Sequence, residues 1–183
     1  MKAAVVQALG APVVIEDRSD PEPGPGRVRI RVEASGLCHT DIHAAHGDWP
    51  VRPEPPFVPG HEGVGLVEKP GDGVSHLSVG DRVAAPWLGK ACGRFDHCLS
   101  GWETLRERQI NTGYGTSVIG SIVGTRQDLA EVFPRHAAGR TRVSHETLPQ
   151  RGDPQLAAVD EAIDEVLRGQ VKARIVFGLG AGR

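Results

Sequence analysis

Aromatic residues are scarce in this sequence, making up only 4% of its 183 positions. A core must therefore rest on Val, Ile, Leu and Ala, while 24 glycines and 14 prolines mark frequent turns. This mixture favours short strands. The formal net charge is only -2, so the composition gives no sign of a nucleic-acid or membrane-surface partner.

Long apolar runs and a cysteine framework are also missing. No stretch is long enough to span a bilayer, and the first residues lack the pattern of a secretory signal. We therefore expect a cytoplasmic protein. Cys38, Cys92 and Cys98 are too few and too unevenly placed for a disulfide framework. Metal binding or simple burial is the expected role of these thiols.

The clearest strand signal lies at Arg27–Ala34, where apolar and charged residues alternate with period two. Shorter candidate strands occur at Ala3–Gln7, Val13–Asp17, Gly63–Glu68 and Asp81–Ala85. The pattern predicts a mainly β fold with a few helices. We expect residues 1–90 to form an antiparallel, partly open barrel.

Helix signals are fewer. Thr40–Ala45 can form a short helical turn just after the best strand. A second helix can begin at the capping motif Thr125–Asp128 and end near Gly139. Pro134 lies inside that second helix, where proline costs about 3 kcal/mol or forces a kink.

The last forty residues predict one more helix and a closing strand. Asp153 can act as N-cap, with Pro154 at the first helical position and Gly169 as the stop. Arg174–Phe177 then has the composition of a strand.

One short run, Leu37–Trp49, concentrates a cysteine, three histidines and two aspartates. A metal-centred site, a proton relay and a polar loop are all compatible with it. A single cysteine and a single histidine at the separation of Cys38 and His61 more often form a buried thiol and a hydrogen-bonded imidazole than a metal site.

Four motifs together carry a family resemblance: Cys38–His43 (CHTDIH), Gly60–Gly65 (GHEGVG), Gly80–Val83 (GDRV) and the cysteine pair that begins at Cys92. They closely resemble bacterial zinc-dependent alcohol dehydrogenases of the medium-chain family. The similarity runs from residue 1 to about Tyr114 and resumes near residue 118. Between these points the family would carry about 150 further residues, one domain's worth.

The resemblance implies a GroES-like catalytic domain that lacks most of the Rossmann cofactor domain. Residues 1–117 are its N-terminal part, 118–140 a remnant of the last strand and helix of the cofactor domain, and 141–177 the C-terminal part. The glycine-rich residues 178–183 follow a strand as a dinucleotide fingerprint does, but neither a helix nor an acidic residue follows them. We expect them to form a flexible tail, we assign no cofactor-binding residues, and we do not expect tight NAD(P) binding.

The resemblance also implies a catalytic zinc site. Cys38 and His61 match two of its three protein ligands, and the family's second cysteine falls in the missing segment. Glu62 matches a glutamate that can approach the metal, so it could serve as the third ligand. Such a donor set is acceptable for zinc, with lower affinity than the complete site.

Roles beyond the ligands follow from the same resemblance. Thr40 matches the hydroxyl that takes the substrate proton, and His43 the histidine that passes it to solvent. Asp41 is the expected acceptor that orients the ligand His61. Trp49 and Trp87 match walls of a pocket for a small alcohol or aldehyde, although each could equally be an ordinary core or surface aromatic.

A second, structural zinc site of the family is degraded here. The family places four cysteines in the spacing C-x-x-C-x-x-C-x₇-C. Cys92 and Cys98 fit the first and third positions, whereas Phe95 and Arg106 occupy the second and fourth. Structural zinc supplies folding free energy, so we expect the lobe at 90–108 to be loosely held.

Two functions remain open at this point. The first is a zinc-binding, alcohol dehydrogenase-like domain whose own oxidoreductase activity is lost or very weak, with residual metal-activated water chemistry. The second is a non-catalytic binding or assembly module. In that case the apolar strand at 117–124, which lacks its original sheet, would pair with the same strand of a second chain.

Overall fold

The computed structural model describes residues 1–48, 52–87, 94, 96–100, 110–112, 116–118, 124–148 and 158–179. The chain divides into two compact units. The first unit combines Met1–Trp87 with Ser144–Arg183, and the second is Leu88–Val143. Trp49 and Cys92 lie outside the described residues, as do the predicted helix start at Asp153 and its neighbour Pro154.

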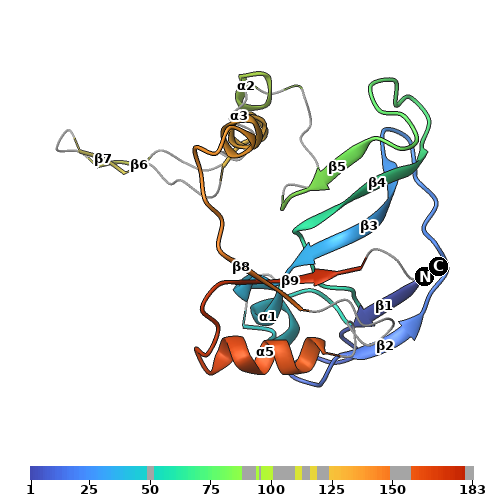
Figure 1. Cartoon of the computed structure of the whole chain (residues 1–183), viewed down its shortest axis with the longest axis vertical. Helices are drawn as coiled ribbons and strands as arrows, with labels where there is room; N and C mark the ends of the chain where they lie inside the picture. The colour runs from blue at the N-terminus through green and yellow to red at the C-terminus, as the bar shows by residue number, and fades with distance from the viewer. Residues whose placement is uncertain are drawn as a thin grey trace. The chain divides into compact units, whose positions relative to one another are not determined.

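The first unit is built on a five-stranded sheet with the strand order β5-β4-β3-β9-β8 (Figure 1). The strands are β3 (Val28–Gly36), β4 (Gly63–Pro70), β5 (Arg82–Ala85), β8 (His145–Leu148) and β9 (Arg174–Gly178). Neighbouring strands are antiparallel except for β8 and β9, which are parallel. The sheet brings the two halves of the unit together, because β9 pairs directly with the end of β3.

The predicted alternation at β3 is only partly reflected in burial. Register shifts interrupt the pairing of β3 with β4, between Arg29 and Ile30 and between Val32 and Ala34. Val32 is 38% exposed, although the period-two pattern places it with the apolar face. Each irregularity changes the face of the sheet to which the following side chains point. The period-two pattern therefore predicts more buried residues than the strand contains.

A second, two-stranded sheet pairs β1 (Lys2–Val5) with β2 (Val14–Asp17) in antiparallel register. Val5 and Val6 are fully buried there, and Val6 forms an isolated bridge with Phe57. This bridge ties the N-terminus to the segment that leads into β4.

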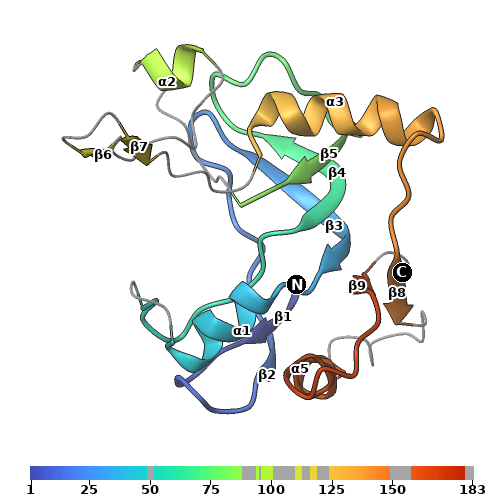
Figure 2. The same cartoon turned by 90° about the vertical axis from the view of Figure 1, so that its left-hand side faces the viewer.

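Two helices complete the first unit, α1 (His39–His46) and α5 (Val159–Leu167). α5 has Ala158 as its N-cap, and its face packs against β9. A core cluster joins α5, β9 and the residue before the N-cap of α1; its buried members are Leu37, Val159, Ala162, Ile175 and Phe177. Figures 1 and 2 show α5 beside β9.

The second unit contains α2 (Asp96–Leu99), a hairpin of β6 (Ile110–Thr112) and β7 (Thr116–Val118), and α3 (Arg126–Ala137). The predicted capping motif is present, because Thr125 Oγ1 accepts from the Asp128 N–H at 3.2 Å while Asp128 Oδ2 accepts from the Thr125 N–H at 2.7 Å. α3 continues through Pro134, and none of its residues is buried.

The expected fold class is confirmed as mainly β with a few helices, and the predicted strands, the short helix at 40–45 and the closing strand are present. Among the described residues the strands form three separate sheets, and none closes on itself. The parallel strand β8 was not predicted. The expected tail boundary at 178 is wrong: Gly178 pairs with Ala34, and the Leu179 N–H donates to the Glu33 carbonyl at 2.6 Å.

Two further expectations concern surfaces. Within the described part of the chain, no helix has both the length and the apolar character needed to cross a membrane. The strand expected at 117–124 is described only up to Val118, and there it pairs with β6 of the same chain. Pairing with a second chain through residues 117–124 stays a prediction.

Candidate metal centre

The centre forms where β3 ends and α1 begins. Cys38 is the N-cap of α1 and has an extended backbone, which turns the chain from the sheet into the helix. Its N–H donates to Asp41 Oδ2 at 3.0 Å. Asp41 therefore satisfies one of the backbone donors that a helix start leaves open, and it fixes the position of Cys38.

Asp41 also connects this turn to the segment before β4. It is only 8% exposed, and its second oxygen, Oδ1, lies 2.9 Å from His61 Nδ1. A carboxylate only accepts, so the proton of this hydrogen bond belongs to Nδ1. A neutral His61 then carries its lone pair on Nε2. The predicted contact between Asp41 and His61 is present, whereas its role toward a metal stays a prediction.

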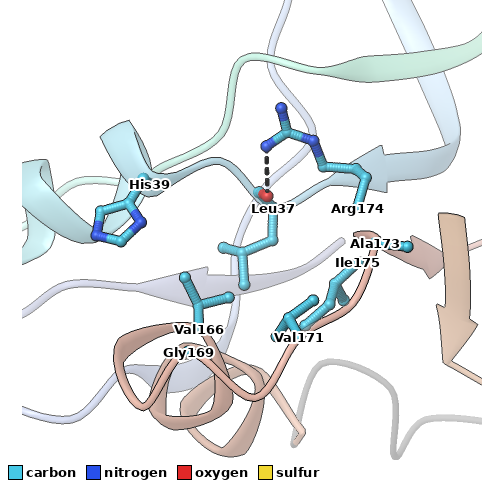
Figure 3. A pocket seen from close by; sticks show the side chains of 8 residues that line it. All are labelled: Leu37, His39, Val166, Gly169, Val171, Ala173, Arg174 and Ile175. Carbon is cyan, nitrogen blue, oxygen red and sulfur yellow. Dashed lines mark hydrogen bonds between the residues drawn. The ribbon is translucent and has the colours of Figure 1, made fainter. Parts of the chain in front are cut away.

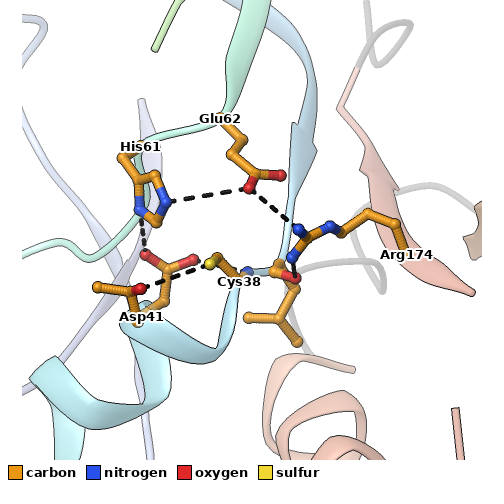
Figure 4. Close-up of polar contacts among 7 residues, drawn as sticks. Cys38, Asp41, His61, Glu62 and Arg174 are labelled. Atoms are coloured by element: carbon orange, nitrogen blue, oxygen red, sulfur yellow. Dashed lines mark hydrogen bonds and ion pairs between the residues drawn. The ribbon is translucent and has the colours of Figure 1, made fainter. Parts of the chain in front are cut away.

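Three potential metal ligands converge beside this contact. One ligand atom from each of Cys38, His61 and Glu62 lies within 4.8 Å of the other two. His61 Nε2 is 3.9 Å from Glu62 Oε1, and all three residues are partly buried. Figure 4 shows the three side chains facing one another across the β3–α1 turn. A thiol, an imidazole and a carboxylate are the three donor types that bind zinc in proteins.

Gly36 makes room for the Glu62 carboxylate. A Cβ atom built at Gly36 would lie 2.2 Å from Glu62 Oε2 and 3.3 Å from Glu62 Cβ. Any side chain at position 36 would therefore displace the carboxylate. No sequence motif predicts this requirement, because Gly36 precedes the Cys38–His43 motif.

Arg174 is a further residue of the centre that the sequence reasoning did not find. Its Nη1 donates to the Leu37 carbonyl at 2.9 Å, and its Nη2 lies 3.6 Å from Glu62 Oε1. The guanidinium thus faces the Glu62 carboxylate (Figure 4). Arg174 is the first residue of β9, and only the pairing of β9 with β3 brings it to residues some 110 to 140 positions earlier.

The environment of Cys38 favours its thiolate. Partial burial opposes ionisation, but hydrogen bonds, first from Thr40 and then from Arg174, outweigh burial and hold the pKa of the thiol below its ordinary value. Cys38 Sγ lies 3.5 Å from Thr40 Oγ1. The thiolate is the form that binds metals and attacks electrophiles, so the lowered pKa makes Cys38 a better ligand.

The remaining predicted residues surround this centre. Thr40 places its hydroxyl against the Cys38 sulfur. His43 lies beside His39, with ring centroids 5.0 Å apart, and its Nδ1 is 3.9 Å from Asp48 Oδ2. Trp87 presents an edge-on contact to the His61 ring at a centroid distance of 4.8 Å, and it is 45% exposed.

The degradation expected at the structural zinc site stays a prediction, because most of that site lies outside the described residues. Cys98 lies on α2 and is partly buried. Its expected partner Cys92, and the positions of Phe95 and Arg106, lie outside the described residues.

A hollow of about 360 Å³ adjoins the centre between the start of α1, the end of α5 and β9. His39 and Arg174 supply its polar side chains, and aliphatic residues with one glycine supply the others. Figure 3 shows these two residues on opposite sides of Leu37. The complete lining is Leu37, His39, Val166, Gly169, Val171, Ala173, Arg174 and Ile175.

Comparison with known sequences defines the family. The sequence profile of the alcohol dehydrogenase GroES-like domain matches residues 24–138, which is more than half of the chain. The chain therefore belongs to the alcohol dehydrogenase GroES-like domain family. It is 61% identical over 114 residues to an alcohol dehydrogenase of Rhizobium meliloti (strain 1021), and 56% identical over 117 residues to one of Moraxella sp. (strain TAE123).

These matches are partial on both sides. They cover 62% and 64% of this chain, but 34% and 35% of the two relatives. The chain thus spans about a third of the length of the curated relatives it matches. A solved structure of a cobalt- and zinc-bound thermostable alcohol dehydrogenase from Pyrobaculum aerophilum is similar at a TM-score of 0.51 and 30% identity, covering 68% of this chain and 36% of that one.

Proposed function

We propose that this chain is an alcohol dehydrogenase-like domain that binds zinc through Cys38, His61 and Glu62. The observation that carries the proposal is the convergence of these three ligand atoms within 4.8 Å. Two of the residues lie next to each other just before β4, and the third is at the N-cap of α1. These three ligand atoms come together only when the chain is folded. The similar alcohol dehydrogenase from Pyrobaculum aerophilum is described as cobalt- and zinc-bound.

The three donors suit zinc, and neighbouring residues hold two of them in the form that binds a metal. The lowered pKa of Cys38 favours the thiolate ligand. The hydrogen bond from His61 Nδ1 to Asp41 leaves Nε2 available, which is the carboxylate–histidine arrangement typical of zinc ligands. Three protein ligands would leave a fourth position open, as in catalytic rather than structural sites.

The Glu62 carboxylate already has a charged partner. Arg174 Nη2 approaches Glu62 Oε1 at 3.6 Å. Arg174 would hold the carboxylate when no metal is present, so that it is not left as an uncompensated charge in a partly buried site. This competition lowers the zinc affinity that we expect.

A zinc ion held here would supply Lewis-acid polarisation of a substrate oxygen. The chain's own groups would then manage the proton. Thr40, whose hydroxyl lies beside the Cys38 sulfur, would accept the substrate proton, and His43, which is 43% exposed, would exchange it with solvent. Trp87, edge-on to His61, would limit access of water, and Trp49 is proposed as a second wall. The expected substrates are small alcohols or aldehydes.

We propose that NAD(P)-dependent turnover by this chain alone is lost or very weak. Hydride transfer depends on a nicotinamide that is held and oriented by the protein. Dinucleotides of this kind bind at the strand ends of a doubly wound parallel sheet, and the described residues contain parallel pairing only between β8 and β9. Water activated at the metal could still support slow hydration or hydrolysis.

The alternative function is a non-catalytic assembly module. It is favoured by α3, which buries none of its residues and leaves Val132 47% and Phe133 55% exposed. Homo-oligomerisation through residues 117–124 belongs to this alternative. Light scattering of the purified chain tests it, because a monomer at all concentrations contradicts assembly through this segment.

Metal content of the purified chain tests the main proposal. Inductively coupled plasma mass spectrometry should find one zinc in the wild type and a large loss in Cys38→Ser and His61→Ala. Cys98→Ser is the matched control, because it removes a thiol outside the centre, and it should keep the metal. Equal zinc in all four proteins would refute the centre. Calorimetric titration with NADH is the companion measurement, and micromolar binding would contradict the expected loss of cofactor affinity.

A further inference from the structure

Beside the Cys38 centre, α1 carries a second arrangement of metal-binding side chains on its exposed face. His39 and His43 are four residues apart on the helix, which places them on the same face, one turn apart. His39 is exposed and His43 is 43% exposed. Their imidazoles are therefore accessible from solvent, whereas Cys38, His61 and Glu62 are partly buried.

The spacing of the two rings matches a shared metal ion. Their centroids are 5.0 Å apart, with 44° between the ring planes. Two imidazole nitrogens that each lie about 2.0–2.1 Å from one metal put their centroids roughly 4.5 Å apart at a right angle and roughly 5.2 Å apart at the tetrahedral angle. The observed separation falls between these two geometries.

The turn after α1 adds a supporting carboxylate. Gly47 ends the helix in the left-handed conformation, with φ 78°, and the Asp48 N–H donates to the His43 carbonyl at 3.0 Å. This turn brings Asp48 Oδ2 to 3.9 Å from His43 Nδ1. A carboxylate beside Nδ1 favours the tautomer that carries the lone pair on Nε2, which is the usual support of a metal-ligating histidine.

We propose that His39 and His43 form a second, solvent-facing site for a divalent transition metal, with Asp48 as its supporting carboxylate. Imidazole donors suit zinc, copper and nickel, and water would fill the remaining positions. The site does not depend on the Cys38 centre. One consequence rests on the proposed function: a metal held by His43 would withdraw the imidazole that we assign to proton exchange, so excess metal would inhibit.

His46 supplies a matched control on the same helix. It is exposed, and its Nδ1 donates to the Ile42 carbonyl at 2.9 Å. Its ring thus contacts its own backbone. If any surface histidine could bind Ni²⁺, His39→Gln and His46→Gln would weaken Ni²⁺ binding equally. The proposed site contains His39 but not His46, so only His39→Gln should weaken it.

The test is calorimetric titration of the full chain with Ni²⁺ after one equivalent of Zn²⁺ has been added. The wild type should bind one Ni²⁺, and His39→Gln should weaken that affinity at least about tenfold, since losing a ligand costs no less than losing a supporting carboxylate. His46→Gln should stay close to the wild type. A loss smaller than tenfold in His39→Gln, or an equal loss in His46→Gln, overturns the proposal.

Two further variants keep this result independent of folding and of the Cys38 centre. Circular dichroism checks that His39→Gln is folded, and Asp48→Asn, in the exposed turn, repeats the test through the supporting carboxylate. Unchanged Ni²⁺ affinity in Asp48→Asn also counts against the site. Cys38→Ser should lose zinc in the metal-content measurement, and in a titration with Ni²⁺ and no added zinc it should still bind one Ni²⁺, so failure of either metal site is seen separately.

Discussion

Replacing Asp41 tests the link between folding and the metal centre, because this one side chain supports both. Asp41 is 8% exposed. It accepts the Cys38 N–H at 3.0 Å and the His61 Nδ1–H at 2.9 Å. In Asp41→Ala both donors lose their acceptor, and a hydrogen bond to a charged group contributes about 1.5–3 kcal/mol. His61 is still 18% exposed, so water can partly replace the second bond.

From these two bonds we expect Asp41→Ala to lower the free energy of unfolding by about 2–4 kcal/mol. Asp41→Asn can still accept from one of the two donors, and should cost about half as much. Urea denaturation followed by circular dichroism measures both. The matched control is Asp81→Ala, because Asp81 accepts a single backbone N–H, from Ser78 at 2.7 Å, in an exposed turn. Its expected cost is below about 1 kcal/mol.

The same variants should weaken zinc binding, since Asp41 orients the His61 ring. Loss of a carboxylate behind a metal-ligating histidine typically costs about 10–100-fold in affinity. A competition titration against a chromophoric chelator measures this, at a urea concentration of zero so that each variant is folded. The reasoning is refuted if Asp41→Ala is no less stable than Asp81→Ala, or if zinc affinity is the same in Asp41→Asn and wild type.

Three further predictions follow from single positions. Gly65→Ala should cost roughly 2 kcal/mol or more in urea denaturation, because its Cβ would lie 2.0 Å from the Arg31 carbonyl oxygen in the backbone of β3; Gly24→Ala, with nothing within 4 Å, should be nearly neutral. Gly36→Ala should weaken zinc binding while changing the free energy of unfolding little, because the added Cβ clashes with the end of the flexible Glu62 side chain. Equal zinc affinity in Gly36→Ala and the wild type would contradict this. Iodoacetamide alkylation of metal-free Cys38 should show a midpoint below the ordinary value for a thiol, because hydrogen bonds lower the pKa of this thiol. Thr40→Val should raise the midpoint, and a wild-type midpoint at or above the ordinary value would exclude the effect.

The sheet pairing explains why some elements of the centre were predictable and others were not. Cys38, His61 and Glu62 lie in two short motifs that resemble a known family, so the sequence pointed to them without any coordinates. The Asp41–His61 contact also followed from that resemblance, and it is present. Arg174 and Gly36 belong to no motif, and their importance depends on which strands become neighbours.

Local physical chemistry determined the elements of this protein. Period-two alternation, capping residues and glycine stops predict most of the strands and helices, because these signals act between residues a few positions apart. Tertiary structure decided the rest: the parallel pairing of β8 with β9, the exposure of Val32 and the approach of Arg174 to Glu62. Each of these features depends on how distant segments pair in register. That register is selected by the free energy of packing and is not encoded in any short stretch of sequence.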